Sequence, residues 1–230
     1  MDFLVKALVF FHVSAGFTAL CLFFVPAVAR KGGRVHNLTG RWYTYAMWTV
    51  VGTAGALCVY HYATGHVMTA MFLGFLALLT ARPLYYGVAV LRNKREPSRR
   101  MLLVDRALRS GLAGGGPYLI GAGLGWWGPG AHTLFIVFGT LGTLVSVPGL
   151  LREWRGTPVG YNWLEQHLSH MIVTAIAAFT AFFAFGGRSL FGDAMDGPLQ
   201  TVVWITPTLL GVAFSRWYKY RLRARTQVPG

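Results

Sequence analysis

Acidic residues and cysteines are scarce in this chain of 230 residues. Seven Asp and Glu stand against 21 Lys and Arg, and charged residues of both signs make up only 12% of the sequence. Both cysteines, Cys21 and Cys58, lie within apolar runs, so they offer neither a disulfide framework nor a CxxC metal site. With 54% hydrophobic residues, this scarcity of charge excludes an ordinary soluble domain.

Several sequence signatures of enzymes and pumps are also missing. The chain has no Walker loop, nucleophile elbow, dinucleotide fingerprint or pair of catalytic carboxylates. The last apolar run has no lysine in its core, which argues against a retinal Schiff base. All seven acids lie near the ends of apolar runs or in loops, so we expect no carboxylate proton relay across the protein.

Apolar runs of about twenty residues recur along the chain, and each can cross a hydrocarbon core about 30 Å thick. We therefore predict an all-α fold, a single domain over residues 1–230, built as a polytopic membrane bundle of seven transmembrane helices. The predicted spans cover residues 3–29, 40–62, 66 to the charged turn at 92–97, 106–127, 131–151, 163–185 and 198–217.

The fourth predicted span is rich in glycine. Small residues let helices approach closely in lipid, so we expect this span in the middle of the bundle. Its glycines and flanking arginines leave open a re-entrant segment in place of a full crossing.

The distribution of Lys and Arg predicts the orientation. In this sequence 18 of the 21 lie in or beside the segments after the first, third, fifth and seventh spans. Because cationic loops stay in the cytoplasm, the N-terminus is expected outside and the C-terminus inside. Their clustering in short inter-helix segments favours contact with anionic lipid headgroups of the bilayer over nucleic acid.

Segments at both ends of the chain resemble an uncharacterised family of bacterial multi-pass membrane proteins. These segments are His12-Val13-Ser14-Ala15-Gly16, Arg30 to His36, Gly40-Arg41-Trp42-Tyr43, His167 to Met171, Ile176 to Phe182 and Trp204 to Thr208. The resemblance implies a helical membrane fold in the bacterial inner membrane and supplies no reaction. The stretch from His12 to Gly40 also resembles the cytochrome b561 superfamily, which implies histidines that ligate haem b on neighbouring helices.

Histidines near the predicted inner surface form the first candidate site. His167 and His170 are three residues apart at the start of the sixth span, so they share a helix face, and His36 lies at a similar depth. Three imidazoles can hold a divalent metal such as zinc, with Glu165 as the catalytic carboxylate beside an activated water. Alternatively, Glu165 caps the helix and the histidines bind lipid headgroups.

A haem b between His12 and His170 is the second candidate site. Counted from the ends of their spans at about 1.5 Å per residue, the two histidines reach similar depths. Arg82 lies deep beside Pro83 and can pair with a haem propionate or an anionic substrate. Alternatively, His12 binds a neighbouring hydroxyl or carbonyl, and Arg82 snorkels inward or caps carbonyls that Pro83 frees.

Two classes of function follow from these patterns. The first is a histidine-based haem- or metal-binding protein with redox or hydrolytic activity. The second is a non-catalytic accessory subunit or a small-ligand-binding membrane protein, associated with another membrane protein or with copies of itself.

Overall fold

The computed structural model describes residues 3–127, 132–157, 160–186, 192 and 198–226, and in these ranges it is helical without a strand. The predicted all-α fold is therefore confirmed. The helices are α1 (Phe3–Val28), α2 (Arg34–Ala63), α3 (Val67–Ala89), α4 (Arg99–Gly123), α5 (Thr133–Trp154), α6 (Trp163–Ala181), a π-helical turn η1 (Phe182–Gly186) and α8 (Pro198–Thr226).

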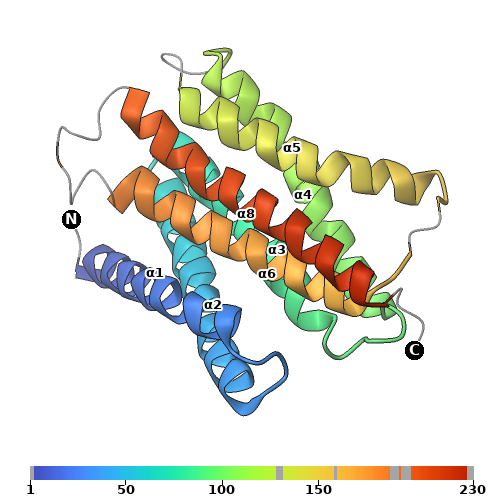
Figure 1. Ribbon diagram of the computed structural model, residues 1–230. Helices are drawn as coiled ribbons and strands as arrows, with labels where there is room; N and C mark the ends of the chain where they lie inside the picture. The colour runs from blue at the N-terminus through green and yellow to red at the C-terminus, as the bar shows by residue number, and fades with distance from the viewer. Residues whose placement is uncertain (1–2, 128–131, 158–159, 187–191, 193–197, 227–230) are drawn as a thin grey trace.

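Consecutive helices run in opposite directions along the bundle. One end of the bundle holds the C-termini of α1, α3, α5 and α8 (Figure 1). The N-termini of α2, α4 and α6 lie at the same end. We call this the basic end, because the Lys- and Arg-rich segments of the chain lie there. The arrangement matches the alternation that the sequence predicts.

Two helices begin earlier than predicted. Helix α2 starts at Arg34, six residues before the expected start of the second span at Gly40. Helix α4 starts at Arg99, where the Ser98 hydroxyl accepts a hydrogen bond from the Met101 backbone N–H at 3.4 Å. Both helices therefore extend through polar turns beyond their apolar runs. A side-chain cap marks the start of α4, whereas Gly33 before α2 makes no side-chain cap hydrogen bond.

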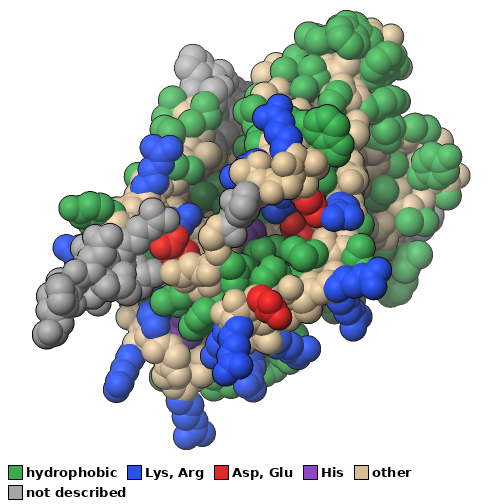
Figure 2. Space-filling view, turned by 90° about the vertical axis from the view of Figure 1, so that its right-hand side faces the viewer, with side chains coloured by type: hydrophobic (Ala, Val, Ile, Leu, Met, Phe, Trp, Pro, Cys, Tyr) green, Lys and Arg blue, Asp and Glu red, His purple; other side chains and the backbone are tan. Residues whose placement is uncertain are grey.

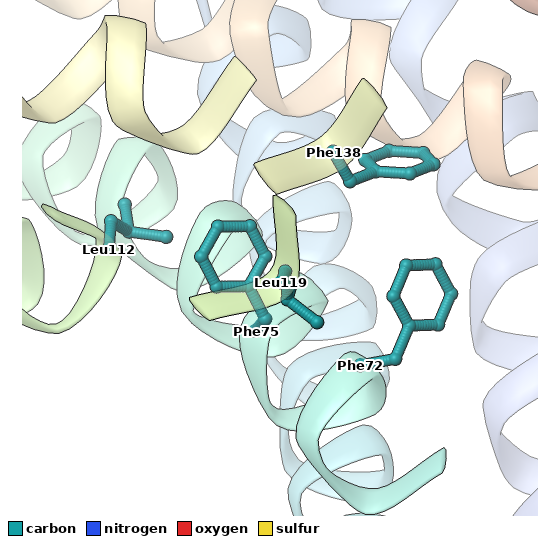
Figure 3. Close-up of a cluster of buried hydrophobic side chains, with 5 residues drawn as sticks. All are labelled: Phe72, Phe75, Leu112, Leu119 and Phe138. Atoms are coloured by element: carbon teal, nitrogen blue, oxygen red, sulfur yellow. The ribbon is translucent and has the colours of Figure 1, made fainter. Parts of the chain in front are cut away.

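Helix α3 occupies the centre of the bundle, where we expected the glycine-rich fourth span. It contacts α2, α4, α5 and α6, whereas α4 packs on α5 and α3. One core cluster joins α3 to α4 and α5 through aromatic and leucine side chains (Figure 3), listed as Phe72, Phe75, Leu112, Leu119 and Phe138. The other two core clusters also contain side chains of α3, namely Leu84 in one and Tyr86 in the other.

The glycines of α4 and α5 bring these two helices together and make room for an aromatic ring. A Cβ on Gly116 would lie 2.7 Å from the Gly139 carbonyl oxygen, so the two backbones are in direct contact. The Phe75 ring fills the space beside Gly115 and Gly142, where a Cβ would lie 3.0 Å and 2.9 Å from ring carbons. Helix α4 continues unbroken through all its glycines, so it is not formed as two re-entrant halves.

Three of the described helices, α1, α3 and α5, are long and apolar enough to cross a membrane. Their most apolar windows have mean hydropathies of 2.2, 1.7 and 2.0. Much of this apolar surface faces outward, since the side chains of Phe10, Phe11 and Phe17 on α1 are each more than half exposed. Helices α2, α4, α6 and α8 contain more polar residues.

Candidate functional site

Two arginines converge on one buried aspartate between α3 and α4. Arg82 donates from Nε to Asp105 Oδ1 at 2.9 Å, and Arg109 Nε lies 2.7 Å from Asp105 Oδ2. The side chains of Arg82, Asp105 and Arg109 are 12%, 6% and 20% exposed. We call these three residues the Arg–Asp–Arg cluster. It lies about 10 Å from the basic ends of the two helices, counted at about 1.5 Å per residue.

A glycine on α5 makes room for the Arg109 side chain. A Cβ on Gly149 would lie 2.8 Å from Arg109 Cζ, closer than real contacts allow. The guanidinium therefore rests directly on the α5 backbone, one turn beyond the buried Ser146. Three helices thus form the cluster, since α3 supplies Arg82, α4 supplies Asp105 and Arg109, and α5 supplies the surface beneath Arg109.

His170 on α6 lies beside the cluster. Its ring stacks on Tyr86 with centroids 4.5 Å apart, and its Nδ1 donates to the Gln166 carbonyl at 2.8 Å. Tyr86 follows Arg82 by four residues on α3, so the stacked ring lies on the same helix face as this guanidinium. Helix α6 therefore brings an imidazole toward the cluster.

The cluster has one positive charge more than its carboxylate can neutralise. In the part of the chain that the structure describes, each guanidinium meets Asp105 through Nε and its Nη groups make no hydrogen bond. Figure 2 shows the basic end, where Lys and Arg side chains surround only a few acidic ones. Since buried charges need partners, this arrangement is suited to binding an anion.

His36 and His167 form a second polar group where α1 ends. His36 Nδ1 donates to the Pro26 carbonyl at 3.0 Å, and His167 Nδ1 donates to the Gly87 carbonyl at 2.7 Å. Lys31 donates to the same Pro26 carbonyl as His36, so these two side chains lie side by side. Lys31 donates to the Pro26 and Ala27 carbonyls at the α1 C-terminus, and partial burial lowers the pKa of its ammonium.

All four histidines of the predicted sites donate through Nδ1. For His12 the acceptor is Thr53 Oγ1 at 2.9 Å, since that hydroxyl donates its own proton to the Thr49 carbonyl. In neutral imidazoles this leaves the Nε2 lone pair available. Histidines that ligate metals usually have the same arrangement, in which the second nitrogen is held by a protein acceptor.

The predicted three-histidine metal centre is not formed. Within the described residues, no three side chains of His, Cys, Asp or Glu come close enough together to hold a metal ion. His167 binds α3 at Gly87, while His170 stacks on Tyr86 beside the Arg–Asp–Arg cluster. A spacing of three residues places both rings on one face of α6 but directs them to different neighbours.

The structure also separates His12 from His170. His12 binds Thr53 of α2, whereas Tyr43 of α2 hydrogen-bonds to Thr174 of α6 at 2.8 Å. Tyr43 and Thr174 thus lie at the same level of the bundle. Thr53 on α2 and His170 on α6 lie on opposite sides of this level, so the two helical rises add to a separation of about 20 Å. The two histidine nitrogens that bind one haem iron lie about 4 Å apart, each about 2 Å from the metal. These two imidazoles therefore do not fit a shared haem. The bond to Thr53 is instead the hydroxyl contact that the sequence left open.

Glu165 lies in the first turn of α6, as predicted. The Asn162 side chain caps this helix by accepting hydrogen bonds from the N–H groups of Leu164 and Glu165 at 3.1 and 3.2 Å. A negative charge in the first turn is favourable because the helix dipole is positive there.

Asp105 lies deeper in the bundle than its sequence position predicts, and Arg109 is a member of the cluster that was not predicted. We expected all acids near span ends or in loops, but Asp105 is only 4% exposed. Arg82 pairs with this carboxylate, a partner that was not among the alternatives for Arg82, namely a haem propionate, an anionic substrate, snorkelling and capping of carbonyls. The available signal was Arg82 itself, since an arginine deep in an apolar helix requires a partner, and Asp105 and Arg109 share a helix face by their spacing.

Comparisons with known proteins found no match. No family model, curated protein or solved structure matches the chain. The resemblances to a bacterial multi-pass family and to the cytochrome b561 superfamily therefore stay predictions.

Proposed function

We propose that the protein is an integral membrane protein of the bacterial inner membrane, with seven crossing helices, an outer N-terminus and an inner C-terminus. Three apolar helices and the gathering of Lys and Arg at one end support this topology. The basic residues near the end of α8, such as Lys219 and Arg221, would then meet anionic lipid headgroups.

Reporter fusions test this topology. Fusions after Arg95 and Arg225 should report the cytoplasm, and a fusion after Trp127 should report the outside. A cytoplasmic signal after Trp127 would remove α4 as a crossing helix and overturn the seven-helix arrangement.

Within this topology, the protein binds a small anionic ligand at the Arg–Asp–Arg cluster. The supporting observation is that two buried guanidiniums share one carboxylate and keep their Nη groups without hydrogen bonds among the described residues. Charged groups are expensive to hold within a membrane, and they are found there mainly where they serve a ligand, an ion path or a partner charge. An anion supplies the missing negative charge and the missing acceptors.

Titration calorimetry of the purified protein in zwitterionic detergent tests the binding function. Small anions of several classes, including a carboxylate and inorganic phosphate, should be titrated in chloride-poor buffer. Arg82→Gln should weaken binding roughly tenfold, as expected when a hydrogen bond to a charged group is lost. Arg106→Gln is the matched control, because Arg106 lies exposed on α4 and pairs with Glu153 instead. Equal binding by both variants would contradict the proposal.

A second candidate function uses His36 and His167 as ligands of a transition metal or of a haem. It is favoured by the bonds from both Nδ1 atoms to backbone carbonyls, which orient each Nε2 for a ligand. Elemental analysis and a visible spectrum of the purified protein test it, with His36→Ala and His167→Ala as variants. Protein without metal or colour after growth with added zinc and haem would exclude this candidate.

A further inference from the structure

An apolar groove of about 450 Å³ lies between α1 and α2, which pack side by side (Figure 1). Its walls include Ala15 and Thr18 of α1 and Trp42, Tyr45, Ala46 and Thr49 of α2. Because Ala15 and Ala46 have small side chains, the two helices leave this space between them. The Thr18 and Thr49 hydroxyls donate to carbonyls of their own helices at 2.8 and 3.1 Å, so the groove offers few polar groups to a ligand.

The groove lies in the inner half of the membrane in the topology proposed above. The apolar run of α2 begins at Gly40, so Trp42 and Thr49 lie about 3 and 14 Å into a hydrocarbon core about 30 Å thick. The rings of Trp42 and Tyr45 are 58% and 61% exposed, and they meet edge to face with centroids 6.0 Å apart. Such aromatic side chains are typical of the boundary between headgroups and hydrocarbon.

Two arginines lie at the inner end of the groove. Arg41 directly precedes Trp42 and is one turn from Tyr45, and Arg34 lies two turns earlier on the same face of α2. Both arginines are exposed, and among the described residues neither forms a hydrogen bond or an ion pair. The sequence has no Asp or Glu from residue 3 to residue 95, so α1, α2 and α3 supply no carboxylate to balance them.

We propose that an anionic phospholipid of the inner leaflet binds this site, with one acyl chain in the groove and its phosphate on Arg41. The inference rests on the proposed topology, because it requires the basic end to face the inner leaflet. Arg41 lies about 2 Å into the apolar run, at the level where lipid phosphates meet hydrocarbon. Its guanidinium fork matches a pair of phosphate oxygens.

Charge selects the class of lipid. The phosphate of a zwitterionic lipid is balanced by the lipid's own ammonium group, which the unpaired arginines repel. An anionic lipid brings a net negative charge to Arg41 and also to Arg34, which lies about 10 Å further toward the cytoplasm. The groove has a volume in the usual range for ligand sites, about 300–1,000 Å³, and an acyl chain matches its apolar walls.

Native mass spectrometry of the full-length protein tests the proposal. The detergent-purified protein is loaded with equal amounts of phosphatidylglycerol and phosphatidylcholine that carry the same acyl chains. We expect phosphatidylglycerol to be retained several-fold more than phosphatidylcholine. Equal retention of the two lipids, or retention of neither, would overturn the inference. The reporter fusions test the topology separately, so its failure is distinguishable from failure of the lipid site.

Variants of the arginines test the headgroup contact. Arg41→Gln should lower the preference for phosphatidylglycerol several-fold, and Arg34→Gln should lower it less because this arginine lies further from the groove. Arg41→Lys keeps the charge without the fork and should retain an intermediate preference. Arg100→Gln, an exposed arginine on α4, is the matched control and should leave the preference unchanged. A preference equal in Arg41→Gln and Arg100→Gln would overturn the assignment of Arg41.

Variants of the groove test the acyl-chain contact. Ala15→Phe fills the space and should lower the retention of phosphatidylglycerol several-fold. Val13→Phe is the matched control, because Val13 is 61% exposed and lies on the opposite face of α1, two residues away. Circular dichroism shows whether each variant is folded. Equal retention by the two folded variants would overturn the groove as the site. A dimer without bound lipid that Ala15→Phe dissociates would assign the groove to a second copy of the chain and overturn the inference.

Discussion

Helix α4 carries two ionic contacts one turn apart, and they differ in almost every physical respect. Arg106 donates from Nε to Glu153 of α5 at 3.0 Å, with both side chains at least one-third exposed and their charges matched one to one. Arg109, one turn on, lies against Asp105 with Arg82 in a buried group of two cations and one anion. Water and salt screen the first contact, whereas the second depends on its own members for charge balance.

This difference teaches that exposure determines what an ion pair does in this protein. An exposed pair can be broken at little expense because water solvates the partners. A buried group with excess charge is expensive and is retained where it serves a ligand or a specific arrangement. The following variants break or sharpen the comparison, from the largest expected effect to the smallest.

Asp105→Ala should have the largest effect on stability. It leaves two buried guanidiniums facing each other without an anion, and removing one partner of a buried pair typically costs about 3–5 kcal/mol. Unfolding in detergent by denaturant measures the loss. Glu153→Ala is the matched control on the exposed contact. A loss for Asp105→Ala no larger than for Glu153→Ala would show that burial does not separate the two contacts.

Gly149→Ala should come next, because the new Cβ would meet the Arg109 guanidinium and force it off the α5 backbone. Overpacking of this kind costs about 1–3 kcal/mol. Gly114→Ala is its control, since nothing lies within 4 Å of a Cβ there. The control should be neutral or slightly stabilising because alanine favours helix over glycine. Similar losses of stability in both variants would indicate that these helices are generally sensitive to an added methyl group, and that Gly149 has no special role in making room for Arg109.

Arg109→Gln should destabilise the protein less than Asp105→Ala. It leaves Arg82 and Asp105 as a matched pair, so the expected loss is about 1 kcal/mol from the removed charged contact. Denaturant unfolding of both variants under identical conditions measures the difference. A loss as large as that of Asp105→Ala would mean that excess positive charge is not what distinguishes the cluster.

Glu153→Gln should have the smallest effect. The pair with Arg106 is exposed, and any contribution should disappear as salt screens it. Unfolding measured in low and in high salt checks this expectation. If the loss of stability persists in high salt, the Arg106–Glu153 pair behaves like the buried cluster, and exposure does not distinguish the two contacts.

Much of the secondary structure was predictable because its signals are local. The apolar runs placed the end of α2 and the start of α3 within one residue of their positions in the structure, and the predicted start of the sixth span at residue 163 coincides with the start of α6. The early start of α4 was missed because Ser98 acts as a cap within a polar stretch that hydropathy alone does not assign to a helix.

The candidate site was only partly predictable. Arg82 was identified from its depth in an apolar helix, but its partner was not, since Asp105 lies close to a charged turn in sequence. The three-histidine centre and the pairing of His12 with His170 are not formed, for a related reason. Equal depth counted along separate spans does not include the tilt and offset of helices, which place His12 and His170 about 20 Å apart.

The sequence by itself determined the helical fold, the alternation of helix direction and the gathering of positive charge at one end. These properties depend on single segments and on how each one meets solvent or lipid. Only the tertiary structure decided that α3 is central, that Asp105 joins Arg82 to Arg109, and that Gly149 leaves room for the Arg109 side chain. Those outcomes depend on the rotation and offset of helices against one another, which small residues on several helices set together through close contact.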